Sequence, residues 1–244
     1  MSQDDPLFQV ADFVRATVPR EPVAAIFDLD STLFCVSPRT RAILHQLASD
    51  PAFQSQFETE ANQLKTAEVR PTDWGLKTVL LRHTPTAPMD FFRRVRDYWR
   101  SHFFSSHFLH QDEIYPFADE YVRHLESLGA TIFYLTGRPE SAMREGTLQA
   151  LAKWRFPLPA PGHLLMKPDH VEADEHFKTL ALKDLTRRFK HIWFFENEPV
   201  IIHEVRSALP QVRMVFVDSV HSGKASPPLD LPKIGMTYHG RWRD

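Results

Sequence analysis

PVAAIFDLDST, residues 22–32, is the stretch that decides the fold class. Its first six residues, 22–27, form an apolar run that is too short for a helix and is typical of a strand buried on both faces. The run ends in Asp28 and Asp30, which lie two positions apart and can therefore point their carboxylates toward one pocket. The stretch predicts a buried strand that carries acidic side chains at its carboxyl end.

Apolar runs and amphipathic segments alternate in the second half of the chain. Strands are expected over ATIFYL (130–135), HIWFF (191–195) and VRMVFV (212–217). Helices are expected over 7–17, over 118–128 before Gly129, from Pro139 to about Leu151, over 175–189, and from Pro199 onward. Strand–helix–strand alternation is typical of an α/β protein with a mostly parallel sheet that helices cover on both faces.

Residues 38–113 interrupt this alternation directly after the first strand. The region is punctuated by prolines and is mostly helical in pattern, so we interpret it as a helical lobe inserted into a core domain of residues 1–37 and 114–244. Its aromatic cluster is interpreted as the core of the lobe rather than as a platform for stacking bases. The cluster comprises Phe91, Phe92, Trp99, Phe103, Phe104 and Phe108. The tail, about 219–244, has no assignment.

Composition and charge narrow the range of partners. The 244 residues include 29 basic and 31 acidic side chains, a net charge of -2, so no overall field attracts nucleic acid or an anionic membrane. Because a neutral protein can still carry a local basic patch, a nucleic-acid partner stays open as the less favoured alternative. The single cysteine, Cys35, fits a reducing compartment, and neither a secretory signal nor a membrane-spanning run is recognisable. We expect a cytoplasmic protein with no membrane association and no obligate protein partner.

Polar residues follow the predicted strands where ligands of open parallel sheets bind. The two aspartates after the first strand and Glu196 after the third would bind a hard cation such as Mg²⁺. A carboxylate beside such a cation can attack phosphorus to form an aspartyl-phosphate, while Asp30 is placed for acid–base work. Thr136 would donate to the phosphoryl oxygens, and a lysine would supply further positive charge. Each motif alone is also typical of a turn or a helix cap. Their occurrence in order after successive strands favours an active site over these structural roles.

The motifs in this order resemble the haloacid dehalogenase superfamily across roughly residues 22–218. They are D-x-D-x-T at 28–32, L-T-G-R at 135–138, a helical lysine and an acidic strand end. The resemblance implies a Rossmann-like three-layer core, a helical cap over residues 38–113, and Mg²⁺ as cofactor. It makes Asp28 the nucleophile and Asp30 the acid/base, whose backbone carbonyl also binds Mg²⁺. An acid at position 30 suits the phosphatases of the superfamily.

The resemblance also implies a set of site residues. The catalytic residues would be Asp28, Asp30, Thr136 and Lys178; the substrate-binding residues Thr136, Gly137, Arg138 and Thr32; and the metal ligands Asp28, Asp30, Glu196 and Asn197. Arg39 joins the substrate-binding set because it lies just beyond the first motif, near the expected hinge into the lobe. Lys178 is preferred over Lys167 and Lys183 because its spacing from Glu196 along the sequence is similar to the spacing in polynucleotide 3′-phosphatase domains. Glu196-Asn197 departs from the aspartates that the family usually carries here.

These observations predict a Mg²⁺-dependent phosphomonoesterase that acts on a small phosphorylated metabolite. Two alternatives stay open. The first is a phosphatase of nucleic-acid or nucleotide phosphate ends, which the lysine spacing suggests and the near-neutral charge disfavours. The second is a catalytically weak member that binds a phosphorylated ligand, which the Glu196-Asn197 pair suggests.

Overall fold

The computed structural model describes residues 5–168 and 173–243, and its centre is a parallel sheet. The strands lie in the order β5-β4-β1-β6-β7-β8. They are β1 (Val23–Phe27), β4 (Thr131–Pro139), β5 (Leu164–Lys167), β6 (His191–Glu196), β7 (Arg213–Val217) and β8 (Lys233–Ile234). Every neighbouring pair is parallel. Because β1 lies inside the sheet and is covered on both faces, all five of its residues are buried, as its continuous apolar run predicted.

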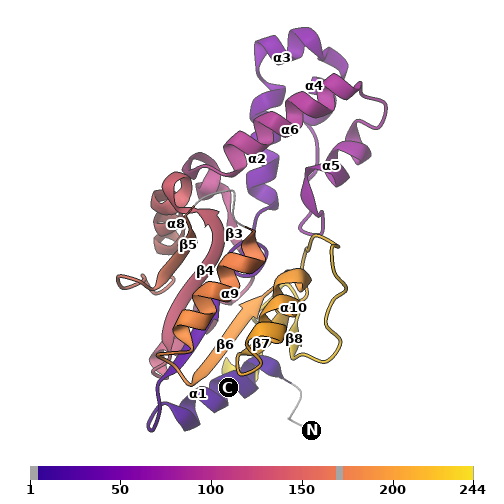
Figure 1. The fold of residues 1–244 in the computed structure, drawn as a ribbon. Helices are drawn as coiled ribbons and strands as arrows, with labels where there is room; N and C mark the ends of the chain where they lie inside the picture. Colours follow the sequence, from indigo (N-terminus) through magenta and orange to yellow (C-terminus); the bar gives the residue numbers. More distant parts are fainter. Residues whose placement is uncertain (1–4, 169–172, 244) are drawn as a thin grey trace.

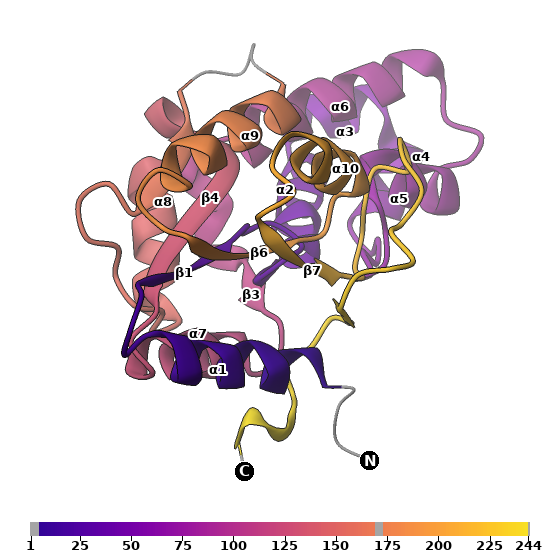
Figure 2. The same cartoon turned by 60° about the horizontal axis from the view of Figure 1, so that its bottom comes forward.

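Helices cover the two faces of the sheet (Figures 1 and 2). They are α1 (Pro6–Thr17), α7 (Ala118–Ser127), α8 (Glu140–Lys153), α9 (Asp174–Leu185) and α10 (Pro199–Ala208). Val23, Ala25 and Phe27 of β1 pack into one apolar core with α1, α7 and α8, whereas Ala24 and Ile26 pack into a second core with α9 and α10. The alternation of strand side chains between two cores confirms the predicted Rossmann-like three-layer α/β sandwich.

A helical lobe extends beyond the carboxyl ends of the strands (Figure 1). Its helices are α2 (Ser37–Ala48), α3 (Pro51–Gln56), α4 (Glu58–Leu64), α5 (Gly75–His83), α6 (Met89–Phe103) and the 3₁₀ helix η1 (Ser106–Gln111). The chain enters and leaves through two short antiparallel strands, β2 (Phe34–Cys35) and β3 (Glu113–Ile114). The lobe has an apolar core of its own, with Phe91 and Val95 of α6 fully buried in it. These two paired strands lie close to the expected ends of the 38–113 insertion, whose bounds as a domain stay a prediction.

Several elements differ from the sequence-based expectation. β5 and β8 were not predicted, because both are short and lie at or near the sheet edges. The expected helix over 175–189 ends at Leu185, and residues 186–189 form turns. Residues 1–4, 169–172 and 244, which the predicted core domain includes, lie outside the described residues. Among the helices of the described chain, none is both long and apolar enough to span a membrane.

The unassigned tail packs against the loop that follows β1. Tyr238 is fully buried, contacts Tyr121 of α7, and donates a hydrogen bond from its hydroxyl to the Thr32 carbonyl at 3.2 Å. Ser219 donates to the Ser31 carbonyl in the same loop. The tail therefore stabilises the segment that carries Asp28 and Asp30, and no local pattern in its sequence indicated this.

Candidate active site

The carboxyl ends of three neighbouring strands meet at one cavity. Phe27 is in register with Tyr134 of β4 and Phe195 of β6, so Asp28 leaves the sheet beside the ends of both strands. The cavity has a volume of about 180 Å³. It is lined by Asp28, Asp30, Phe104, Thr136, Gly137, Arg138, Asp174, Lys178, Glu196, Asn197, Glu198 and Ile201. The structure thus brings most of the predicted site residues to one place; Thr32 and Arg39 are fully buried.

Lys178 joins the ends of β1 and β6. Its ammonium donates to Asp28 Oδ1 at 2.6 Å and to Glu196 Oε2 at 2.7 Å, and the side chain is 3% exposed. Burial opposes the charge on Lys178, but the two carboxylates raise the pKa of Lys178 above its ordinary value, so it stays protonated. Of the two other candidate lysines, Lys167 pairs with Asp174, which lines the same cavity, and Lys183 is exposed on α9.

Asp28 and Glu196 are carboxylates in a largely dry environment. Burial raises the pKa of Asp28 above its ordinary value, against the pull of Lys178. Burial likewise raises the pKa of Glu196 to about 7, although Lys178 acts in the opposite direction. Glu196 Oε1 accepts the backbone N–H groups of Asn197 and Glu198, both at 3.0 Å. Both oxygens of Glu196 therefore already have hydrogen-bond donors.

The hydrogen bonds of Asn197 account for an amide at a position where the sequence resemblance led us to expect an acid. Its Nδ2 donates to the Val220 carbonyl at 2.6 Å, and its Oδ1 accepts from the Thr32 hydroxyl at 3.2 Å. A carboxylate at this position would place an oxygen against the Val220 carbonyl. The neighbouring Glu198 accepts from the backbone N–H and the hydroxyl of Ser222, so the 219–222 segment holds both side chains.

Asp30 faces two buried arginines. Its Oδ1 accepts from Arg39 at 2.7 Å and from Arg138 at 2.5 Å. Burial alone would raise the pKa of Asp30, but Arg138 and Arg39 hold it well below its ordinary value. Arg39 was predicted to bind substrate; it is fully buried on α2 and ties the first helix of the lobe to Asp30.

Asp112 completes this charge network, and sequence reasoning missed it. Its oxygens accept from Arg39 Nε at 2.8 Å and from Arg138 Nη2 at 3.0 Å, and its side chain is fully buried. Burial raises the pKa of Asp112 to about 6, with both arginines acting against the rise. Asp112 follows η1, where the chain returns from the lobe, so Arg39 and Asp112 connect both ends of the lobe to the core.

Backbone geometry shapes the two loops that carry the motifs. After β1, the Leu29 carbonyl accepts the N–H groups of residues 32, 33 and 34, and Ser31 adopts a left-handed conformation with φ 62°. This compact turn brings Asp30 back over the end of the strand. Near the end of β4, where the register with β5 shifts between Thr136 and Pro139, a Cβ on Gly137 would lie 2.5 Å from the Asp174 carboxylate, so a larger residue would displace that side chain.

The chemistry of the donor set fits a hard cation. Asp28, the Asp30 backbone carbonyl and Asn197 Oδ1 are all oxygen donors, the type that Mg²⁺ prefers. Within the described residues, no three His, Cys, Asp or Glu side chains form a group able to hold a metal ion. This finding is compatible with Mg²⁺, which keeps several waters and is commonly bound by one or two carboxylates together with substrate phosphate.

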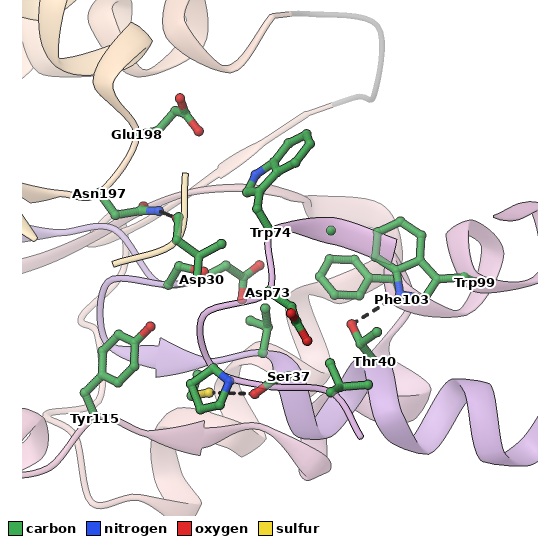
Figure 3. Close-up of a pocket in the computed structure, with 17 residues that line it drawn as sticks. Asp30, Ser37, Thr40, Asp73, Trp74, Trp99, Phe103, Tyr115, Asn197 and Glu198 are labelled. Atoms are coloured by element: carbon green, nitrogen blue, oxygen red, sulfur yellow. Dashed lines mark hydrogen bonds between the residues drawn. The ribbon is translucent and has the colours of Figure 1, made fainter. Parts of the chain in front are cut away.

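A second cavity of about 230 Å³ adjoins the first and shares Asp30, Asn197 and Glu198 with it. Figure 3 shows the residues that line this second cavity. It lies between the end of the sheet and the lobe, whose α2, α5 and α6 contribute lining residues. Trp99 and Phe103, interpreted from the sequence as lobe core, line this cavity, and Phe104 lines the first one. Only part of the aromatic cluster is therefore interior packing.

Solved structures that are similar to this chain share its architecture, whereas comparisons of sequence find no match. No protein-family model matches the sequence, and no curated protein matches it. Among solved structures, it is similar to a chain assigned as a haloacid dehalogenase-like hydrolase from Bacteroides fragilis, with a TM-score of 0.51, 15% identity, and 89% and 98% of the two chains covered. It is also similar to a chain assigned as a phosphatase from Clostridium difficile, with a TM-score of 0.51, 15% identity, and 88% and 94% covered. The protein therefore has the fold of the haloacid dehalogenase-like hydrolases.

Proposed function

We propose that this protein is a Mg²⁺-dependent phosphomonoesterase in which Asp28 is the nucleophile. One observation carries the proposal: the buried Asp28 carboxylate lies at a cavity, 2.6 Å from the ammonium of Lys178. The cavity also contains Thr136 and Gly137 from the end of β4. Such an arrangement offers a nucleophile, fixed positive charge and a hydroxyl in one small space.

In the proposed reaction, an Asp28 oxygen attacks phosphorus and the bond between phosphorus and the ester oxygen breaks. An aspartyl-phosphate results, and water then attacks its phosphorus to release phosphate and restore Asp28. Lys178 orients Asp28 through a hydrogen bond to Oδ1. The Thr136 hydroxyl would donate to a phosphoryl oxygen, and Arg138 would keep Asp30 oriented.

Asp28, the Asp30 backbone carbonyl and Asn197 Oδ1 would hold the cation. When bound, Mg²⁺ neutralises charge on the phosphoryl oxygens and helps to orient the ester. Glu196 was also predicted as a ligand. Its Oε1 accepts two backbone N–H groups and its Oε2 accepts from the Lys178 ammonium, whereas Asn197 Oδ1 accepts a single hydrogen bond, so we propose that Glu196 fixes Lys178 and the turn after β6 instead.

Asp30 is proposed as the acid/base. With two arginines beside it, Asp30 is ionised, the form that can accept a proton from the hydrolytic water. Protonation of a leaving alkoxide by Asp30 requires at least one arginine to withdraw. Arg39 belongs to α2, so we propose that the lobe of residues 38–113 is a cap whose position controls the proton affinity of Asp30.

The test is hydrolysis of 4-nitrophenyl phosphate by the wild type and by Asp28→Asn, each in Mg²⁺ and in EDTA. We expect Mg²⁺-dependent turnover that falls on the order of 10³-fold or more in Asp28→Asn, because no other group in the site replaces a lost nucleophile. Asp218→Asn is the matched control, since Asp218 also follows a strand, β7, but its side chain is 42% exposed and pairs with Lys233. Equal rates for the wild type and Asp28→Asn would contradict the proposal.

A further inference from the structure

The second cavity is placed to hold the part of a substrate that departs from phosphorus. It shares Asp30, Asn197 and Glu198 with the cavity that contains Asp28, so a group leaving the phosphoryl site enters it directly. Its volume, about 230 Å³, is below the range of about 300–1,000 Å³ typical of sites for drug-sized ligands. The leaving group is therefore small.

Aromatic side chains from both the lobe and the core surround this space (Figure 3). They are Trp74, Trp99, Phe103 and Tyr115. Trp74 is the N-cap residue of α5 and is 50% exposed, whereas Trp99 and Phe103 stack on each other with ring centroids 4.5 Å apart. Trp99 is oriented by a hydrogen bond from its Nε1 to the Thr40 hydroxyl at 3.2 Å. The Phe103 ring already carries the Arg39 guanidinium, 4.1 Å from its centroid, so negative π faces for a ligand come from Trp74, Trp99 and Tyr115, while Phe103 adds apolar surface.

The charged residues that line the second cavity are all acidic. Asp30, Asp73 and Glu198 line the cavity, and its described lining contains no lysine, arginine or histidine. Two of these acids are balanced from outside the cavity: Asp30 by Arg39 and Arg138, and Asp73 by Arg82. Glu198 accepts only from the Ser222 backbone and hydroxyl, with no ion pair among the described residues. Its negative charge therefore remains unbalanced by any basic side chain of the described lining.

We propose that the second cavity binds a cationic leaving group, so that the substrate is a phosphate monoester of a small alcohol bearing an alkylated ammonium. The proposal rests on the phosphatase function proposed above. An alkylated ammonium is attracted by aromatic faces and by the Glu198 carboxylate, while its alkyl groups contact the rings. An anionic leaving group would instead meet Glu198 with no basic residue in the described lining to balance it.

The test compares two substrates that differ only in charge. Phosphocholine carries a trimethylammonium group, and 3,3-dimethylbutyl phosphate replaces its nitrogen with carbon at nearly the same shape. We expect kcat/KM for phosphocholine to exceed that for its neutral isostere by about tenfold or more, the size of a partly desolvated cation–π contact. Equal values, or a preference for the isostere or for the anionic 2-phosphoglycolate, would overturn the proposal.

Variants assign the preference to the cavity. Trp74→Leu and Glu198→Gln should each reduce the ratio of the two kcat/KM values several-fold, whereas a general structural defect would lower both values together. Met89→Ala is the control, because Met89 is a 66% exposed apolar residue of the same lobe that does not line this cavity. An unchanged ratio in both Trp74→Leu and Glu198→Gln would contradict the assignment.

The two proposals fail in different ways. If wild-type protein hydrolyses neither 4-nitrophenyl phosphate nor phosphocholine, the phosphatase proposal fails, and calorimetric binding of phosphocholine and its isostere to the wild type then tests the cavity alone. If 4-nitrophenyl phosphate is hydrolysed but the charge of the leaving group has no effect, only the substrate class is wrong. Tighter binding of phosphocholine than of its isostere in the first case, or faster turnover of phosphocholine in the second, supports the proposed substrate class.

Discussion

Replacement of Lys178 by methionine tests the geometry of the site without reference to turnover. Lys178→Met keeps the length and apolar stem of the side chain and removes the ammonium that lies between Asp28 and Glu196. The variant leaves two buried carboxylates without their cation. Breaking a buried ion pair by removing one partner costs about 3–5 kcal/mol of unfolding free energy. We expect a cost of this size at pH 8, where carboxyls resist protonation.

The cost should shrink as the pH falls. In the wild type, burial already raises the pKa of Glu196 to about 7, and without Lys178 the native variant would bind one proton more to escape the unpaired charge. When folding raises the pKa of a carboxyl, the native state binds more protons than the unfolded state. The free energy of unfolding of the protein then falls as the pH rises from the unfolded-state pKa to the folded-state pKa. The extra proton therefore lowers the stability of Lys178→Met relative to wild type by about 1.4 kcal/mol per pH unit above about pH 5.

Urea unfolding in EDTA at pH 5 and pH 8 measures both quantities. Lys183→Met is the matched control, since Lys183 is an exposed lysine on the same helix, and it should change stability by less than about 1 kcal/mol at either pH. If Lys178→Met and Lys183→Met behave alike at both pH values, Lys178 does not lie between the two carboxylates and the arrangement of the site is wrong.

Two further substitutions test other parts of the site. Asp112→Asn removes an anion that two buried arginines share and should cost about 3–5 kcal/mol in urea unfolding, whereas Asp97→Asn, in an exposed pair with Arg96, should cost less than about 1 kcal/mol; similar costs would argue against the buried network. Asn197→Asp places a carboxylate against the Val220 carbonyl and should lower the melting temperature in EDTA, and Mg²⁺ should then raise it more than it raises that of the wild type. Equal Mg²⁺ shifts in the two proteins would remove Asn197 from the proposed ligand set.

The sequence predicted those parts of the fold that local patterns determine. β1, β4, β6 and β7 were recognisable because strands covered on both faces are continuous apolar runs, and Pro199 indicated the start of α10. β5 was not recognisable: its four residues, LLMK, include a lysine and pair with one neighbour at the edge of the sheet. The end of α9 at Leu185 was missed for a related reason, because residues 186–189 continue the apolar period while forming turns.

Only those residues of the candidate site that belong to a recognisable sequence motif could be predicted. The motifs after β1, β4 and β6 indicated which strand ends to join, and the parallel sheet brings them to one cavity. The partners of those residues depend on contacts between distant segments, such as Arg138 with Asp30, which lies 108 positions away. Asp112 and Val220 carry no local signal at all. The roles of Glu196 and Asn197 likewise became interpretable only when their hydrogen-bond partners were known.

The most direct test of the central claim is to trap the phosphorylated enzyme. Wild-type protein is mixed with Mg²⁺ and excess 4-nitrophenyl phosphate, quenched in acid within the first turnover, digested and analysed by mass spectrometry. The account predicts a phosphoryl group on the peptide that contains Asp28, and no such group when Asp28→Asn is treated in the same way. Turnover with no phosphorylated peptide, or a phosphoryl group on another residue, would contradict it.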